Sequence, residues 1–298
     1  MISDEKYRPV RPRRSTRLLV RGVEYELNEW GPAEGRALVY LHGWGDTGST
    51  FQFVVDALPE DWRIVAPDWR GFGRSTCRAE SYWFPDYVAD LDCLLDAISP
   101  KDPACLIGHS MGANVAGLYC GIRPERVGIL VNVEGFGLAD RDPAGAPDNY
   151  RRWLDQAKSL RPFSEYPGLP ALADRVMKNN PRMRRDRAVF VAAEWADLGA
   201  DGIARLRADP AHKLPNPILY RRAEAEACWQ RAAADVLLVI GAETDFKTGA
   251  KAWIDPDESR QPFHGAPMVV IPAAGHMVHF DAPEALAQAI ADFVTPRL

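Results

Sequence analysis

A short segment about a third of the way along the chain, Gly108-His109-Ser110-Met111-Gly112, could supply a nucleophile. It fits the pattern G-x-S-x-G, with an apolar run before it and a segment of helical character after it. In this context the serine lies on a sharp strand-to-helix turn, where the glycines relieve steric conflict. The first N–H groups of the following helix can stabilise negative charge near the serine. A serine that only caps a helix in a glycine-rich loop is the alternative interpretation.

A serine hydroxyl is a weak nucleophile at neutral pH and needs a base, usually a histidine. His276 lies in the stretch AAGHMVHFDAPE, directly after the apolar run 267–273. A loop at the carboxyl end of a strand of this kind reaches the same edge of the sheet as Ser110, so we expect His276 to be the base. His279 could also reach the site, but it is expected to be structural. His109, next to the serine, is expected to point elsewhere.

The histidine needs a carboxylate to orient it, and two acidic residues are candidates. Asp245 follows the apolar run 235–241, and the order serine, aspartate, histidine along the chain is one that known catalytic triads use. Glu134 directly follows the run 127–133 and could reach the same histidine. We expect Asp245 to be the acid, with Glu134 as the alternative.

The stretch Leu41-His42-Gly43-Trp44-Gly45-Asp46 follows an early apolar run and could complete an oxyanion hole. We expect the backbone N–H groups of Trp44 and Met111 to be its two donors. A donor of this kind contributes about 3 kcal/mol to lowering the barrier. A glycine-rich turn without a chemical role is the alternative for this stretch.

The elements that must position these residues are short, continuously apolar segments. Strands that are apolar throughout and alternate with helices indicate a parallel sheet covered on both faces. Residues 86–98 have apolar side chains at helical spacing, and 283–294 form a further helix with proline near its start. The expected strands lie in 16–28, 37–41, 63–67, 104–108, 127–133, 235–241 and 267–273.

The middle of the chain, from 138 to 230, is rich in arginine, proline and alanine and contains no β-branched run. It is expected to be a helical insertion, which divides the remaining core into 1–137 and 231–298. An insertion there would overhang the carboxyl ends of the strands, where open α/β sheets bind ligands. Its aromatic residues are candidates to line a substrate pocket or to form the insertion's own core: Trp153, Phe163, Tyr166, Phe190 and Trp195.

Composition limits the other classes of function. The formal net charge of −5 gives no general support for binding nucleic acid, and the basic residues of the first 21 positions are expected to be a solvated arm. No stretch approaches the run of about 18 apolar residues that a membrane span needs. The five cysteines have no zinc-site spacing, and reduced thiols would fit a cytoplasmic protein. No metal or cofactor is expected.

Taken together, the motifs HGWGD, DWRGFGRS, GHSMG, GAETD and GHMVHFDAPE occur in the order and spacing of the α/β-hydrolase superfamily. The chain resembles its lid-bearing members over about 30–140 and 230–298. The resemblance implies an α/β-hydrolase fold, with a mostly parallel eight-stranded sheet, helices on both faces and a helical lid. It also implies hydrolysis through an acyl-enzyme by Ser110, His276 and Asp245, without metal or cofactor.

The function expected is cleavage of a carboxylic ester with a small to medium, fairly apolar acyl group, by a monomer or homodimer that acts on a small molecule. Relatives that open epoxides or cleave carbon–halogen bonds carry aspartate where this chain has Ser110, so those reactions are not expected. Three alternatives remain: hydrolysis of a carbon–carbon bond in dienone ring-cleavage products, hydrolysis of thioesters, and a non-catalytic small-molecule receptor.

Overall fold

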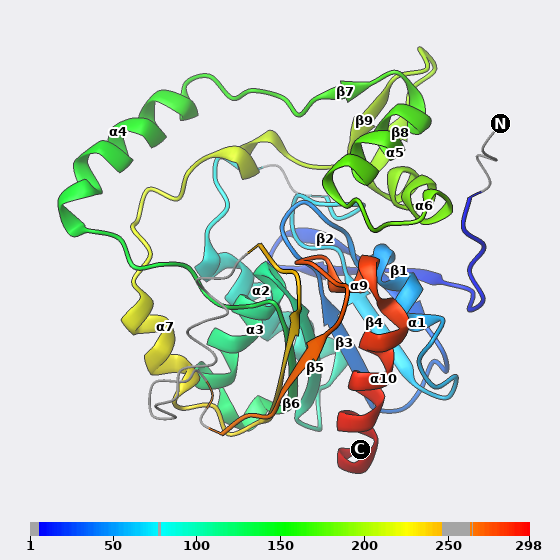
Figure 1. Cartoon of the computed structure of the whole chain (residues 1–298). Coiled ribbons are helices and arrows are strands. Elements are labelled where there is room, and N and C mark those ends of the chain that lie inside the picture. Colours follow the sequence, from blue (N-terminus) through cyan, green and yellow to red (C-terminus); the bar gives the residue numbers. More distant parts are fainter. Residues whose placement is uncertain (1–5, 77–78, 246–262, 264) are drawn as a thin grey trace.

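The structure, a computed structural model, describes residues 6–76, 79–245, 263 and 265–298. Its centre is an eight-stranded sheet in the order β1-β2-β4-β3-β5-β6-β10-β11 (Figure 1). The β1–β2 and β2–β4 pairs are antiparallel, and all other neighbours in the sheet are parallel. The expected eight-stranded, mostly parallel sheet is therefore confirmed. Its strands are β1 (Arg14–Val20), β2 (Val23–Trp30), β3 (Ala37–Leu41), β4 (Arg63–Pro67), β5 (Ala104–His109), β6 (Val127–Val133), β10 (Asp235–Gly241) and β11 (Met268–Ile271).

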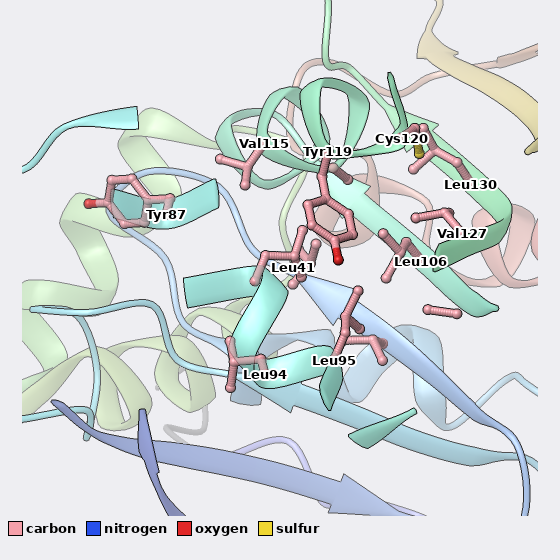
Figure 2. Packing of buried hydrophobic residues seen from close by; sticks show 14 of the residues in the cluster. Leu41, Tyr87, Leu94, Leu95, Leu106, Val115, Tyr119, Cys120, Val127 and Leu130 are labelled. Atoms are coloured by element: carbon pink, nitrogen blue, oxygen red, sulfur yellow. The ribbon is translucent and has the colours of Figure 1, made fainter. Parts of the chain in front are cut away.

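Helices cover both faces of the sheet, which explains why its central strands are apolar throughout. One buried cluster joins the sheet to α2 and α3, and Figure 2 shows how Tyr119 of α3 lies among leucines of β3, β5 and α2. A second cluster joins the other face to α1 and α10. Every residue of β3 and β5 is buried, because each strand has helices on both sides. The helices around the sheet are α1 (Gln52–Val55), α2 (Phe84–Ile98), α3 (Met111–Ile122), α7 (Arg222–Trp229), α9 (Val278–Asp281) and α10 (Pro283–Val294).

The chain between β6 and β10 contains helices and also a small second sheet. Its elements are α4 (Ala146–Ala157), β7 (Glu165–Tyr166), α5 (Gly168–Asn179), α6 (Arg185–Trp195), β8 (Ala196–Leu198) and β9 (Ala204–Leu206). In Figure 1 the part from α4 to β9 runs across the top of the view, above the main sheet, and α7 lies lower, beside α3. The three short strands pair antiparallel in the order β7-β9-β8. The expectation of a purely helical segment missed them, because strands of two or three residues are too short to show a period.

Several basic residues near the amino end are fixed against the core, where a solvated arm was expected, while Lys6, Arg8 and Arg14 are exposed. The Arg11 side chain is buried and donates to the carbonyl oxygens of Val55, Pro59, Glu60 and Trp62. Three further arginines of this region pair with carboxylates: Arg13 with Glu194, Arg17 with Glu26, and Arg21 with Asp86 and Asp90. These hydrogen bonds and ion pairs hold this part of the chain against the core. Among the described residues, no helix combines the length and the apolar character needed to span a membrane.

Replacing Arg11 by alanine should lower the free energy of unfolding by about 2–3 kcal/mol, because buried carbonyl groups lose a charged donor. The matched control is Arg14→Ala. Arg14 is exposed and donates to the single carbonyl of Gly31, so its loss should cost less than about 0.5 kcal/mol. Chemical denaturation of both variants measures the difference. Equal free energies of unfolding for the two variants would contradict the conclusion that Arg11 holds the amino end against the core.

Candidate active site

Ser110 lies at the turn where β5 passes directly into α3. Its backbone has φ 49° and ψ −112°, a conformation that costs a non-glycine residue about 1–3 kcal/mol. The neighbouring glycines are required by close packing. A Cβ on Gly108 would come within 2.5 Å of the Cα of Ala113, and a Cβ on Gly112 would come within 2.1 Å of the carbonyl oxygen of Leu41. The sequence pattern G-x-S-x-G is thus folded as a strained, tightly packed turn.

His276 reaches Ser110 from the loop that follows β11. Its Nε2 lies 2.9 Å from Oγ of Ser110, so it can accept the hydroxyl proton. The His276 side chain is 21% exposed, and this leaves one side of the pair open to a reacting molecule. The structure therefore brings together the serine and histidine that the sequence singles out. His279, the other candidate for the base, is buried and bonds to Asp46 instead.

Glu134 supplies the carboxylate at the other nitrogen of the His276 ring. Its Oε2 lies 3.0 Å from Nδ1 of His276, and its side chain is 0% exposed. The backbone N–H of Gly241 donates to Oε1 at 2.7 Å, and the hydroxyl of Thr244 donates to Oε2 at 2.6 Å. A buried carboxylate needs such donors, and here they come from the last residue of β10 and from the loops after β10 and β11. Glu134 also has a positive φ of 59°, which turns the chain sharply at the end of β6.

The expectation that Asp245 orients His276 is corrected by this geometry. Asp245 is exposed, four residues beyond the end of β10, while Nδ1 of His276 bonds to Glu134. The end of β10 and the loop after it contribute donors to the glutamate, through Gly241 and Thr244, and do not contribute the acid. A residue that directly follows a strand must lie at the edge of the sheet, whereas one four residues later can turn away. That rule favours Glu134 over Asp245 from the sequence alone.

The loop after β3 lies beside the turn at Ser110. A Cβ on Gly43 would come within 3.3 Å of the Cβ of Ser110, so the backbone of this loop closely approaches the serine. Trp44 follows in the same loop, and Met111 begins α3, where the first N–H groups have no acceptor within the helix. This arrangement suits the expected pair of donors, Trp44 and Met111, for a developing oxyanion.

Asp46 fixes the loop after β3 in place, a role that the sequence did not reveal. Its Oδ2 accepts from Nε2 of His279 at 3.0 Å, and its Oδ1 accepts from Thr50 at 2.7 Å and from Nε1 of Trp195 at 2.9 Å. Burial opposes ionisation of Asp46, but the bond and charge of His279 outweigh it and lower the pKa of the carboxyl. The loop is thereby tied both to α9 and to the end of α6.

Asp46 and His279, together with His109, form a group whose possible ligand atoms all lie within 4.8 Å of one another. Such a group could in principle bind a metal ion. In a tetrahedral zinc site with bonds of about 2.1 Å, the ligand atoms lie roughly 3.4 Å from one another, closer than the 4.8 Å limit of this group. Nε2 of His279 bonds to Asp46, and Nε2 of His109 bonds to the backbone of His276. In the structure these groups are therefore hydrogen-bond partners that connect the loops around Ser110.

Aromatic side chains flank the loop after β3. The ring of Trp44 is 53% exposed and lies 6.2 Å from the ring of Phe72 and 6.3 Å from that of Phe163. Phe163 is thus the one expected pocket residue that the structure shows against Trp44. Phe190, Tyr166 and Trp195 instead pack in the cluster that joins the 138–230 segment to the core.

Comparison with known proteins agrees with the fold. Residues 38–289 match the model of the alpha/beta hydrolase family, so the chain belongs to that family. A serine hydrolase-like protein of Danio rerio is 30% identical over 286 residues, which cover 90% of this chain and 84% of the relative. A 3-hydroxybutyrate-oligomer hydrolase of Cupriavidus necator is 30% identical and covers 73% and 76%. Among solved structures, the thioesterase domain from the curacin biosynthetic pathway has a TM-score of 0.83 at 24% identity, with 94% and 99% covered.

Replacing Glu134 by glutamine should slow the reaction of Ser110 with a fluorophosphonate probe by about 10³–10⁴-fold, because the amide cannot hold His276 in the required tautomer. The matched control is Asp245→Asn, which should react within about twofold of the wild type, since Asp245 lies outside the hydrogen-bonded chain. Labelling rates of the purified proteins measure both. A larger loss in Asp245→Asn than in Glu134→Gln would restore Asp245 as the acid.

Proposed function

We propose that this alpha/beta hydrolase cleaves carboxylic esters through an acyl-enzyme formed on Ser110. The observation that carries the proposal is the continuous chain of hydrogen bonds from Oγ of Ser110 through His276 to the buried carboxylate of Glu134. This chain of hydrogen bonds starts at Ser110, whose strained backbone lies at the amino end of α3. That position exposes the nucleophile and sets the N–H donors of the helix beside it.

Acylation begins when Oγ of Ser110 attacks the carbonyl carbon of the ester. Nε2 of His276 takes the hydroxyl proton, and the carboxylate of Glu134 stabilises the imidazolium through Nδ1–H. The negative charge that develops on the carbonyl oxygen is stabilised by the N–H groups of Met111 and Trp44. Collapse of the tetrahedral intermediate breaks the ester bond, and His276 returns its proton to the departing alcohol.

Deacylation repeats these steps with water as the nucleophile. The open side of His276 admits a water molecule, whose proton passes to Nε2 while its oxygen attacks the acyl-serine. The same two N–H groups stabilise the second oxyanion. The acid then leaves, and the proton returns from His276 to Ser110.

The surroundings of Ser110 support an acyl group that is small to medium in size and fairly apolar. The exposed ring of Trp44 lies against Phe72 and Phe163 and presents an aromatic surface on the loop whose Gly43 approaches Ser110. Apolar surface of this kind contributes binding energy in proportion to the area that a ligand covers. The Cupriavidus necator relative is by name a hydrolase of 3-hydroxybutyrate oligomers, which also supports an ester substrate.

We assign the part of the 138–230 segment that precedes α7 as a lid over this site, because α7 itself packs with α3 against the main sheet. Phe163 reaches the ring of Trp44, and Trp195 bonds to Asp46 in the loop after β3. The segment thus contacts the loop that carries the expected Trp44 donor, and changes in the segment should alter the choice of acyl group.

The wild type should hydrolyse p-nitrophenyl esters with acyl chains of two to eight carbons, and Ser110→Ala should reduce kcat by about 10⁴-fold or more, because the nucleophile is lost. Initial rates over the series measure both activity and chain-length preference. A matched series of acyl-CoA thioesters, and a dienone ring-cleavage product, test the alternative bonds.

Equal and negligible rates for the wild type and Ser110→Ala on every ester would contradict the ester assignment. A receptor would show the same inactivity together with saturable binding of a small molecule, and a thioesterase would act on the CoA series alone.

A further inference from the structure

His109 connects the strand that leads to Ser110 with the loop that carries His276. It is the last residue of β5 and directly precedes Ser110, and its side chain is buried. Its Nε2 donates to the backbone carbonyl oxygen of His276 at 2.9 Å. The bond connects residues 167 positions apart in the chain, and the two imidazole rings lie 4.9 Å apart, centroid to centroid.

The rest of the His109 ring is closely packed and electrically neutral. A Cβ on Gly43 would come within 2.8 Å of Nδ1, so the loop after β3 lies directly against the ring. Nδ1 has no hydrogen-bond partner in the described part of the chain. Burial, with the charges of His279 and His276, holds the pKa of His109 well below its usual value. The ring is therefore a neutral donor at Nε2 near pH 7.

We propose that His109 is a positioning residue that holds the backbone of His276, so that the His276 ring reaches Ser110 and Glu134 at once. This inference rests on the proposed function of Ser110 and His276. The His276 ring must place Nε2 at 2.9 Å from Ser110 and Nδ1 at 3.0 Å from Glu134, and both distances depend on where its backbone lies. A displacement of about 1 Å at a reacting group can cost about 100-fold in rate.

The position of His109 at the end of a buried strand holds its ring firmly in place. The ring belongs to a strand whose six residues are all buried, and the strand ends one residue before the nucleophile. The backbone N–H of Ser110 donates to the carbonyl oxygen of Val133 at 2.9 Å, directly before Glu134. The serine, the acid and the support of the base are thereby attached to the paired ends of β5 and β6.

The test compares His109→Gln with His109→Asn. A glutamine amide nitrogen occupies about the place of Nε2 and can donate to the same carbonyl, whereas an asparagine amide nitrogen falls short, near the place of Nδ1. The pair differs by one methylene, and both side chains are neutral and polar. His109→Leu, which fills the volume without a donor, is the third variant.

His212→Leu is the matched control for the loss of a buried histidine. His212 is buried, and its Nε2 contacts the carbonyl oxygen of Arg70 at 3.1 Å while its Nδ1 contacts the hydroxyl of Tyr87 at 3.3 Å. Burial lowers the pKa of His212 to about 3, so this ring is also neutral. Its removal deletes a bond to a backbone carbonyl, as in the His109 variants, together with a bond to Tyr87.

We expect kcat on a p-nitrophenyl ester to fall about 10- to 100-fold in His109→Asn and His109→Leu, with KM within about twofold, because binding is unchanged while the base is displaced. His109→Gln should stay within about threefold of the wild type, and so should His212→Leu. Rates are normalised to folded protein, measured by thermal melting. If His109→Leu does not fold, the Gln and Asn pair carries the comparison.

Three results would overturn the inference: wild-type kcat in His109→Asn, equal losses in the Gln and Asn variants, or an equal loss in His212→Leu. They are distinguishable from failure of the proposed function, which would appear as a wild type that neither hydrolyses esters nor reacts with a fluorophosphonate at Ser110.

Discussion

The hydrogen bond between Nδ1 of His276 and the carboxylate of Glu134 is the contact on which the site depends. It spans the end of β10, because Glu134 follows β6 and His276 follows β11, and β10 lies between them in the sheet. These three strands are parallel, so their carboxyl ends lie at one edge. The parallel order of the sheet therefore sets the distance that the acid and the base must cover, and a glutamate side chain covers it.

The same contact explains how a charge can be buried at this edge. Glu134 accepts from Gly241 and Thr244 as well as from His276, so its oxygens have donors that replace water. An imidazolium that forms at His276 meets a carboxylate already held in place. The strained backbones of Ser110 and Glu134, both with positive φ, hold the two ends of the hydrogen-bonded chain.

The sequence was informative wherever burial imposes a pattern. The runs at 37–41, 63–67, 127–133 and 235–241 match β3, β4, β6 and β10 residue for residue, because strands covered on both faces must be apolar throughout. The acid was predicted at Asp245, after β10, and the structure has it at Glu134, after β6. The order of residues along the chain does not say how far a loop turns away from the edge of the sheet. The pairing of β7, β8 and β9, and the carbonyl groups around Arg11, depend on contacts between distant segments that carry no local pattern.

The most direct test of the account is to identify the atom that receives the acyl group. The protein is mixed with a p-nitrophenyl ester, quenched in acid within the first turnover, digested, and sequenced by mass spectrometry. The account predicts one acyl group per protein on the peptide that contains Ser110, with none in Ser110→Ala. Release of p-nitrophenol by the wild type with no acylated peptide, or with the acyl group on another side chain, would contradict it.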